Sequence, residues 1–370
     1  MKVTVLKNNI REGLGKLEHA VAQKDNLPIL RNVFFKSESG KITITATNLE
    51  MGVMTSIAGK ISEDGGITVP FQTLFDIVSN ADSEKISLET SGTTLRVKTD
   101  NYEAKIQGVP GEDFPIIPAV QNTTPIELDG AVLNEALMAA LPAAHLSEIR
   151  PELSGVLLDF QITFLKFVAT DSFRLAEKTV TEREFKTTVS RGFRAIVPLE
   201  AAREAARLAP QKERVQIFFD PHQVAFRFGG TTLTSRLIDG TYPDYESIVP
   251  KTLDVELDVN RDQLMKGIRL ASSFSGKSSD IKLRLKSGTK ALEVYSSHAS
   301  LGENTYLVPA KCLKGESFTD LSFNWRYVLD GLKSLRGEHV LLGMNGDTRP
   351  SILRSTDDTS YFYIVMPIRL

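Results

Sequence analysis

Residues 3–21 read VTVLKNNIREGLGKLEHAV, a short alternating strand that leads directly into an amphipathic helix. The same order returns as IELDGAVLNEALMAA over residues 126–140 and as LDVNRDQLMKGIRLA over residues 257–271. The matching strand positions are Val5, Leu128 and Val259. They are 123 and 131 residues apart (128 − 5 and 259 − 128). A period of this size indicates repeated domains, because solenoid repeats are only about 20–50 residues long.

A second helix opening also recurs three times. It reads PFQTL at residues 70–74, PLEAA at 198–202 and NWRYV at 324–328. Proline-rich stretches at residues 115–125 and 243–250 are typical of linkers. The sequence therefore predicts three domains of similar build. They occupy residues 1–120, 121–250 and 251–370.

Apolar and polar residues alternate in the segments between these helices. Examples are KITITAT at residues 41–47, LKFVAT at 165–170 and IKLRL at 281–285. This period of two predicts half-buried strands, and turn pairs such as Ser39-Gly40 place neighbouring strands at hairpin spacing. We therefore predict an α+β fold in which each domain packs two helices on antiparallel sheet.

The composition limits the possible functions. The chain has 370 residues, with 44 Lys and Arg against 46 Asp and Glu and a net charge of −2, so nucleic-acid binding requires the charges to be segregated by face. The single cysteine, Cys312, excludes a disulfide framework and a multi-cysteine metal site within one chain. We see no secretory signal or apolar run of membrane length, and therefore expect a soluble, cytoplasmic protein.

Basic residues lie off the apolar stripes of several predicted helices. In the helix predicted over residues 260–274, Leu264 and Ile268 share one stripe, whereas Lys266 and Arg269 fall on the opposite side. Arg203, Arg207 and Arg326 are placed similarly in their helices. For any single helix an ordinary solvated face explains the same pattern, since Lys and Arg are common on exposed surfaces.

No set of residues in the sequence assembles a catalytic site. The five histidines are scattered without metal-ligand spacing, and the Gly276-Lys277-Ser278 stretch lacks the first glycine of a phosphate-binding loop. Asp171 has the residue type of a general base, but a turn residue that binds backbone amides is the favoured interpretation. We therefore expect a binding protein, with no catalytic residue, metal or cofactor.

Several stretches along the chain resemble one family. They are LPIL at residues 27–30, RPELSGV at 150–156, ATDSFRLA at 169–176, LIDGTYPDY at 237–245, FNWRYVLD at 323–330 and VMPIRL at 365–370. Together with the triplication, they are similar to the bacterial sliding clamp, the beta subunit of DNA polymerase III. They occur in that family's order and span the chain.

The resemblance implies a closed ring formed by a head-to-tail homodimer, with helices inside and sheet outside. Such a ring encircles duplex DNA without reading its sequence and acts as a processivity factor in DNA replication. It tethers the polymerase III alpha subunit, the clamp loader and other proteins with clamp-binding motifs. The DNA-facing residues would be Lys24, Arg150, Arg203, Arg207, Lys266, Arg269 and Arg326.

The resemblance also implies a partner-peptide pocket between the second and third domains. Its residues would be Leu153, Gly155, Thr170, Phe173, Arg174, Leu175, Pro243, Ile248, Ile364, Met366, Pro367, Ile368, Arg369 and Leu370. Packing at a domain joint is the alternative explanation for some of them. Ile106 and Phe274 would lie at the dimer interface.

The chain departs from the family's pattern in the second domain. Leu199-Glu200 stands where basic residues are usual, and Ser172-Phe173 replaces a small residue followed by His or Tyr. The helix predicted over residues 133–144 carries no Lys or Arg. A triplicated peptide-binding scaffold that does not encircle DNA is the alternative function, and an enzyme with an unrecognised site ranks third.

Overall fold

The computed structural model describes residues 1–22, 27–121, 124–286, 288 and 290–369. By internal contacts the chain divides into two units. The first unit contains residues 1–133, 185–189 and 207–237, and the second contains residues 134–184, 190–206 and 238–370.

The first unit contains two antiparallel sheets. The five-stranded sheet has the order β5-β1-β7-β8-β9. Its strands in chain order are β1 (Lys2–Leu6), β5 (Gly59–Glu63), β7 (Lys85–Ser91), β8 (Thr94–Lys98) and β9 (Glu103–Gln107). The nine-stranded sheet has the order β14-β10-β16-β17-β18-β4-β3-β2-β6. Its strands are β2 (Asn32–Glu38), β3 (Lys41–Thr47), β4 (Met51–Ile57), β6 (Gly65–Pro70), β10 (Ile126–Asp129), β14 (Phe185–Thr187), β16 (Arg214–Phe219), β17 (Gln223–Phe228) and β18 (Thr231–Arg236).

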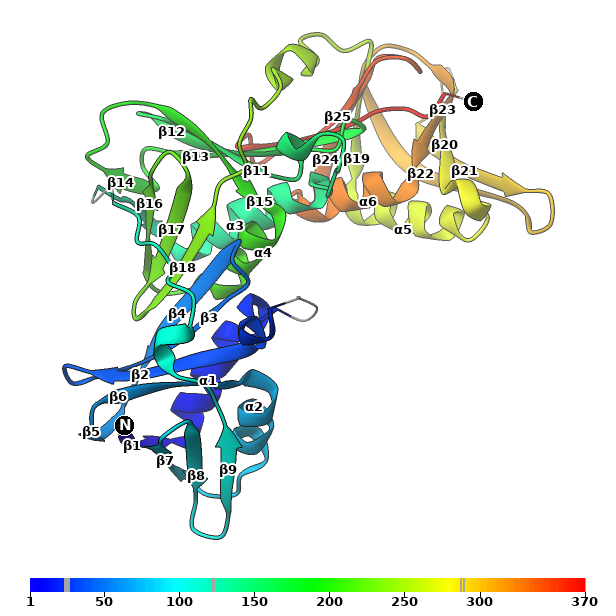
Figure 1. Ribbon diagram of the computed structural model, residues 1–370. Helices are drawn as coiled ribbons and strands as arrows, with labels where there is room; N and C mark the ends of the chain where they lie inside the picture. Colours follow the sequence, from blue (N-terminus) through cyan, green and yellow to red (C-terminus); the bar gives the residue numbers. More distant parts are fainter. Residues whose placement is uncertain (23–26, 122–123, 287, 289, 370) are drawn as a thin grey trace. The chain divides into compact units, whose positions relative to one another are not determined.

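Helices α1 (Lys7–Leu17) and α2 (Phe71–Asn80) pack side by side in the first unit (Figure 1). Ile10, Leu14 and Leu17 repeat at intervals of four and three residues, so α1 buries one continuous apolar stripe. That stripe contacts β1 of one sheet and β3 and β4 of the other. The helix therefore holds the two sheets of this unit on a common core.

The second unit is built on one antiparallel sheet of order β15-β11-β12-β13-β26-β25-β24-β19-β22-β21-β20-β23. Its strands are β11 (Gly155–Gln161), β12 (Phe164–Thr170), β13 (Arg174–Thr181), β15 (Phe193–Pro198), β19 (Val255–Asn260), β20 (Asp280–Leu285), β21 (Ala291–His298), β22 (Gly302–Lys314), β23 (Phe318–Asn324), β24 (His339–Met344), β25 (Ser351–Ser355) and β26 (Tyr361–Val365). Helices α5 (Arg261–Ser272) and α6 (Trp325–Ser334) lie together along this sheet (Figure 1).

Two further helices, α3 (Gly130–Ala140) and α4 (Leu199–Leu208), belong to the middle third of the chain. Short 3-10 helices are Glu18–Ala20, Pro28–Arg31, Gly111–Asp113, Leu141–Ala143, Pro151–Leu153, Tyr245–Ile248 and Gly276–Ser278. The predicted α+β class, with two helices and antiparallel strands in each repeat, is confirmed. None of the described helices combines the length and the apolar composition needed to cross a bilayer.

Two predicted helix ends are corrected by the structure. The helix predicted over residues 133–144 begins at Gly130 and ends at Ala140, where a 3-10 turn containing Pro142 follows. Proline has no N–H to continue the α-helical hydrogen bonds, which explains this end. The helix predicted over residues 260–274 starts after Asn260, whose side chain caps it by accepting from the Gln263 amide at 3.0 Å, and ends at Ser272.

Sheets in both units cross the predicted boundaries between repeats. In the first unit β4 pairs with β18, and Val53 stands opposite Leu233. In the second unit β13 pairs with β26, and Leu175 stands opposite Ile364. Strands that would otherwise be sheet edges therefore form their backbone hydrogen bonds with a strand of a neighbouring repeat.

The packing of α6 predicts opposite effects for two glycine-to-alanine substitutions. A Cβ at Gly331 would lie 2.4 Å from the Tyr363 Cδ1 atom, whereas one at Gly15 in α1 meets no atom within 4 Å. We expect Gly331→Ala to lower the free energy of unfolding by about 1–3 kcal/mol through overpacking. Gly15→Ala should raise it by up to about 1 kcal/mol through helix propensity. Urea unfolding of both variants checks this, and a stabilised Gly331→Ala protein would contradict the packing.

Candidate partner groove and nucleic-acid interface

A tight turn at residues 170–174 joins β12 to β13. The Asp171 Oδ1 atom accepts hydrogen bonds from the Phe173 and Arg174 amides, both at 3.0 Å. Ser172 has a φ of +77°, and its amide donates to the Thr170 Oγ1 atom at 3.2 Å. Asp171 is therefore a turn residue, as the sequence predicted. The turn holds the Phe173 ring in solvent, where the side chain is 61% exposed.

Arg174 connects this turn to helix α6. Its guanidinium lies 2.8 Å from the Asp171 carboxylate and 2.9 Å from the Asp330 carboxylate, and it stacks 4.2 Å from the centroid of the Tyr327 ring. Burial alone lowers the pKa of Arg174, but Tyr363 and the hydrogen-bonded Asp171 raise it above its ordinary value. The side chain is therefore a permanently charged link between the central and C-terminal repeats.

The C-terminal segment lies alongside the same turn. The Met366 amide donates to the Phe173 carbonyl at 2.8 Å, and the Ile368 amide donates to the Ser322 carbonyl of β23 at 2.7 Å. Pro367 between them is buried, and Met366 is half-buried. The segment is therefore fixed by two backbone hydrogen bonds on either side of its proline. Arg369 is exposed, and Leu370 lies outside the described residues.

Apolar residues from several segments form the floor beside the turn. Leu153, Leu175 and Ile364 belong to one buried cluster with Tyr242 and Tyr245. Burial raises the pKa of both tyrosine hydroxyls, so they are neutral near neutral pH. The two tyrosines were not predicted as site residues, although they occur in the quoted 237–245 stretch.

The remaining predicted pocket residues differ in their surroundings. Thr170 is buried within the turn, Pro243 is half-buried and Ile248 is exposed. Gly155 begins β11, and a Cβ there would lie 2.3 Å from the Val197 carbonyl of β15. Gly155 is thus explained by close strand packing.

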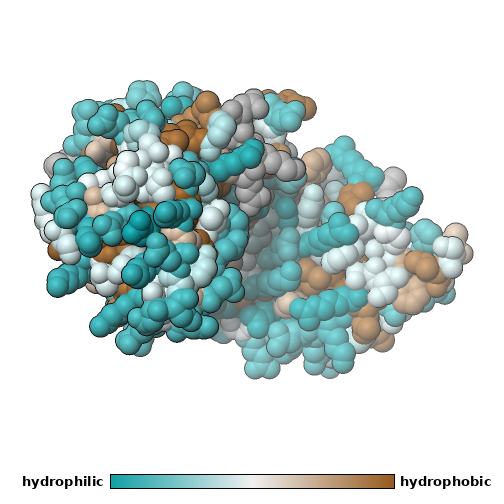
Figure 2. Space-filling model, turned by 60° about the horizontal axis from the view of Figure 1, so that its bottom comes forward, coloured by the Kyte–Doolittle hydropathy of each residue, from teal (hydrophilic) through white to brown (hydrophobic). Residues whose placement is uncertain are grey.

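Three of the predicted DNA-facing residues lie together on a pair of packed helices. Lys266 and Arg269 are exposed on α5, and Arg326 is exposed on the neighbouring helix α6. The Arg326 guanidinium lies 5.1 Å from the Trp325 ring centroid. On the face shown in Figure 2 hydrophilic residues predominate, and hydrophobic residues appear in small separate groups.

Three of the other predicted basic residues, Arg150, Arg203 and Arg207, bind groups of the chain itself. Arg150 lies in a turn and forms a 3.0 Å ion pair with Glu152, and Arg203 forms a 2.8 Å pair with Glu200. The Arg207 guanidinium donates to the Lys16 carbonyl at 3.0 Å. Lys24 lies outside the described residues. The Arg203–Glu200 pair has the i,i+3 spacing of helical ion pairs, whereas the Arg207 partner is 191 positions away and has no signal in the helical pattern.

The two predicted interface residues have different surroundings. Ile106 is on β9, the edge of the five-stranded sheet, but its side chain is only 5% exposed within its own domain. Phe274 follows α5 and is half-buried. In the described part of the chain, no three His, Cys, Asp or Glu side chains are grouped to hold a metal ion.

The geometry of Arg174 predicts a large effect of its removal. Arg174→Met leaves the buried Asp171 carboxylate without its cation, and leaves Asp330 with only the more exposed Lys333 ammonium at 3.3 Å. We therefore expect the free energy of unfolding to fall by about 2 kcal/mol. The matched control is Arg214→Met, which breaks a 3.3 Å pair whose side chains are 44% and 65% exposed. The control should cost less than about 0.5 kcal/mol. Equal urea midpoints for the two variants would contradict the bridging role.

The chain matches three protein-family models in order along its length. They are the N-terminal, central and C-terminal domains of the DNA polymerase III beta subunit, at residues 1–118, 127–244 and 246–369. Together they cover nearly the whole chain.

Relatives and solved structures agree with these matches. A protein of Synechococcus elongatus named beta sliding clamp is 30% identical, with 100% of both chains covered. One of the same name from Chlamydia trachomatis is 27% identical and is covered over 87% of its length by this entire chain. The crystal structure of the Pseudomonas aeruginosa DNA polymerase III beta subunit is 26% identical, with a TM-score of 0.94 over 100% of both chains. The Bacillus subtilis sliding clamp, at 23% identity, has the same fold with a TM-score of 0.94 over 100% of this chain and 99% of that one. The chain therefore belongs to the DNA polymerase III beta subunit family and has its three-domain sliding-clamp fold.

Proposed function

We propose that this protein is a DNA sliding clamp, which encircles duplex DNA as a head-to-tail homodimer and tethers the replicative polymerase for processive synthesis. The observation that carries the proposal is the family membership along residues 1–369. A peptide-binding scaffold that does not encircle DNA is not favoured, because the relatives of full length are named sliding clamps. The clamp acts where the chromosome lies, in the bacterial cytoplasm.

The proposed domains are residues 1–120, 121–250 and 251–370. The first two family matches end at residues 118 and 244, which supports boundaries within the proline-rich stretches that the sequence indicated. The role is that of a non-catalytic processivity factor that needs no cofactor. Its partners are duplex DNA, the polymerase III alpha subunit, the clamp loader and other proteins with clamp-binding motifs.

The DNA-facing surface is proposed to centre on Lys266, Arg269 and Arg326. These cations are exposed on neighbouring helices, so they can attract phosphates through water without fixing the register of the duplex. Attraction of this kind changes little from one base pair to the next, and the protein can slide. Closure of the ring, rather than high affinity, then retains the DNA.

The closure is proposed to pair the β9 edge of one protomer with β22 of its partner. On β22, residues 302–309 pair with β21 on one side, and β19 pairs only with residues 310–314. Backbone groups of β9 point alternately toward β8 and away from it. The Thr99 amide donates to the Tyr102 carbonyl and the Gly108 amide donates to the Thr93 carbonyl, which fixes the residues that face β8. The amides of Glu103, Lys105 and Gln107 then point away from β8. Two free antiparallel edges joined head to tail would leave neither exposed.

The partner-peptide groove is proposed to lie between the 170–174 turn and the C-terminal segment. Phe173 and Ile248 supply exposed apolar side chains above the buried Leu175 and Ile364 floor. Arg174 holds the two repeats in register beneath the groove. A shallow apolar site of this kind suits short motifs from several partners in turn.

The proposed DNA surface predicts a change in salt dependence. Replacing Lys266, Arg269 and Arg326 together by Ala should flatten the slope of log K against log salt for a labelled duplex by about 0.9 per lost phosphate contact. The matched control replaces Lys290, Lys311 and Lys314, which are exposed but not borne by helices. A slope that changes equally in the control triple would refute the assignment.

The proposed closure predicts a monomer from a single edge substitution. Lys105→Pro removes an amide that points away from β8, so the protein should sediment as a folded single chain. Lys105→Ala keeps the amide and should remain dimeric. This pair avoids Ile106, whose substitution would disturb its own buried core. Sedimentation equilibrium and circular dichroism check both variants, and a dimeric proline variant would place the interface elsewhere.

A further inference from the structure

The turn at residues 170–174 has a structural copy in the first unit, at residues 47–51. The Asn48 Oδ1 atom accepts from the Glu50 and Met51 amides at 3.1 and 2.8 Å, as Asp171 does in the other turn. Leu49 has a φ of +72°, and its amide donates to the Thr47 Oγ1 atom at 3.0 Å. The Thr47 hydroxyl donates to the Met51 carbonyl at 2.9 Å, which matches the bond from Thr170 to Arg174. The two turns therefore share one hydrogen-bond pattern.

The strand beside each turn is placed in the same way. The Arg236 amide donates to the Glu50 carbonyl at 3.0 Å, as the Met366 amide donates to the Phe173 carbonyl. Gly52 stands opposite Thr234, as Leu175 stands opposite Ile364. The first unit thus repeats the backbone frame of the proposed partner groove, with different side chains on it.

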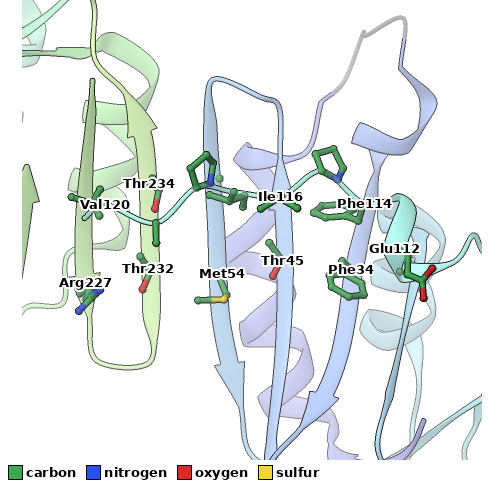
Figure 3. Close-up of a pocket in the computed structure, with 17 residues that line it drawn as sticks. Phe34, Thr45, Met54, Glu112, Phe114, Ile116, Val120, Arg227, Thr232 and Thr234 are labelled. Atoms are coloured by element: carbon green, nitrogen blue, oxygen red, sulfur yellow. The ribbon is translucent and has the colours of Figure 1, made fainter. Parts of the chain in front are cut away.

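The first unit also has a cavity beside this frame. The segment from Gly111 to Val120 crosses the sheet over β2, β3 and β4 and reaches β18, and the cavity lies between this segment and the strands (Figure 3). Its volume is about 470 Å³, in the range of ligand pockets. A smaller cavity of about 200 Å³ shares Gly52, Thr234 and residues 115–118 with it.

The crossing segment is anchored at two points and is otherwise open. The Phe114 ring stacks on the Phe34 ring at 5.6 Å, and Ile117 fills the space that a side chain at position 52 would need, since a Cβ there would lie 2.3 Å from the Ile117 Cδ1 atom. Between these anchors Ile116 is 91% exposed, and Met54 in the cavity is 45% exposed. No backbone group of residues 115–121 bonds to the backbone of another described residue, so this segment has free backbone hydrogen-bonding groups.

Arg227 indicates which charge an occupant needs at the β17 end of the cavity. The Arg227 guanidinium lies 4.3 Å from the Phe218 ring centroid and lines the cavity at its β17 end. Within the described ranges, no carboxylate forms an ion pair with it. Glu112 lines the opposite end in Figure 3, beside Phe34. An occupant with apolar side chains would match the apolar lining of the cavity, and a carboxylate on it could pair with Arg227.

We propose that this cavity is a second docking site, which takes a short extended peptide carrying aliphatic or aromatic residues followed by acidic ones. The apolar side chains enter between Met54 and Phe34, the acidic end pairs with Arg227, and the peptide backbone bonds to the crossing segment. The site is separate from the groove at residues 170–174, so the inference goes beyond the clamp function and does not depend on it.

The test uses the full chain and the labelled peptide Gly-Leu-Phe-Leu-Asp-Asp, with photo-leucine in place of the second leucine. Fluorescence anisotropy should show saturable binding, and crosslinks mapped by mass spectrometry should fall within residues 111–120 or on β3 and β4. Arg227→Glu should weaken this binding about tenfold and should favour the counterpart peptide ending in Lys-Lys. That exchange of preference cannot arise from misfolding.

The matched control is Lys41→Glu, which makes the same charge change on β3 outside the cavity lining. It should leave the affinity for the acidic peptide unchanged. Crosslinks confined to residues 153–175 and 364–369 would overturn the proposal, because the peptide would then occupy only the partner groove. Absence of binding, or equal losses in Arg227→Glu and Lys41→Glu, would overturn it as well.

Discussion

The structure depends on the need to pair the edges of repeated β-sheets. A single repeat of about 120 residues would expose strand edges with free N–H and C=O groups, which invite uncontrolled association. Within the chain, β4 with β18 and β13 with β26 remove such edges by joining strands of successive repeats. The edge at β9 and the first half of β22 remain open in the described part of the chain. In the proposed ring, the β9 edge of one protomer pairs with the free part of β22 in its partner, so neither edge stays exposed.

The same pairing places similar turns at the joints between repeats. Where two repeats share a sheet, a tight turn ends one strand beside the segment that leaves the next. At residues 170–174 the turn carries the exposed Phe173 and the buried link of Arg174. At residues 47–51 the equivalent positions carry Glu50 and Met51, so Arg174 has no cationic counterpart there. One backbone frame therefore carries different side chains at the two places where docking is proposed.

Much of the fold was predictable because its signals are local. Apolar residues that recur every 3.6 positions identified α5, and those that recur every second position identified its flanking strands. The Asp171 turn followed from the preference of aspartate for backbone amides. The pairing of β13 with β26 was not predictable in this way, because it joins residues nearly 200 positions apart. The repeat indicated equivalent domains, but a repeat contains no information on which strands meet.

The candidate sites were less predictable for a related reason. A helical pattern showed that Arg203, Arg207 and Lys266 lie off the apolar stripe, and the structure places all three on exposed positions. The i,i+3 spacing of Glu200 and Arg203 is typical of an ion pair, but the pattern could not show that the Arg207 head group is held by the Lys16 carbonyl, 191 positions away. Similarly, the edge position of β9 does not reveal that Ile106 points into its own core.

The near-zero net charge fits a protein that holds DNA without binding it tightly. A uniformly basic surface would release many counterions on contact and would fix the protein on the duplex, whereas a few exposed helix-borne cations among neutralised ones give a weak attraction. Several other cations already serve the protein itself, as Arg150 does with Glu152 and Arg174 does with Asp330. Among the described helix-borne cations, Lys266, Arg269 and Arg326 are exposed and are the ones proposed to attract phosphates. In the proposed function this attraction is weak and the ring retains the DNA, so closure of the sheet edges is the step on which the proposed function depends.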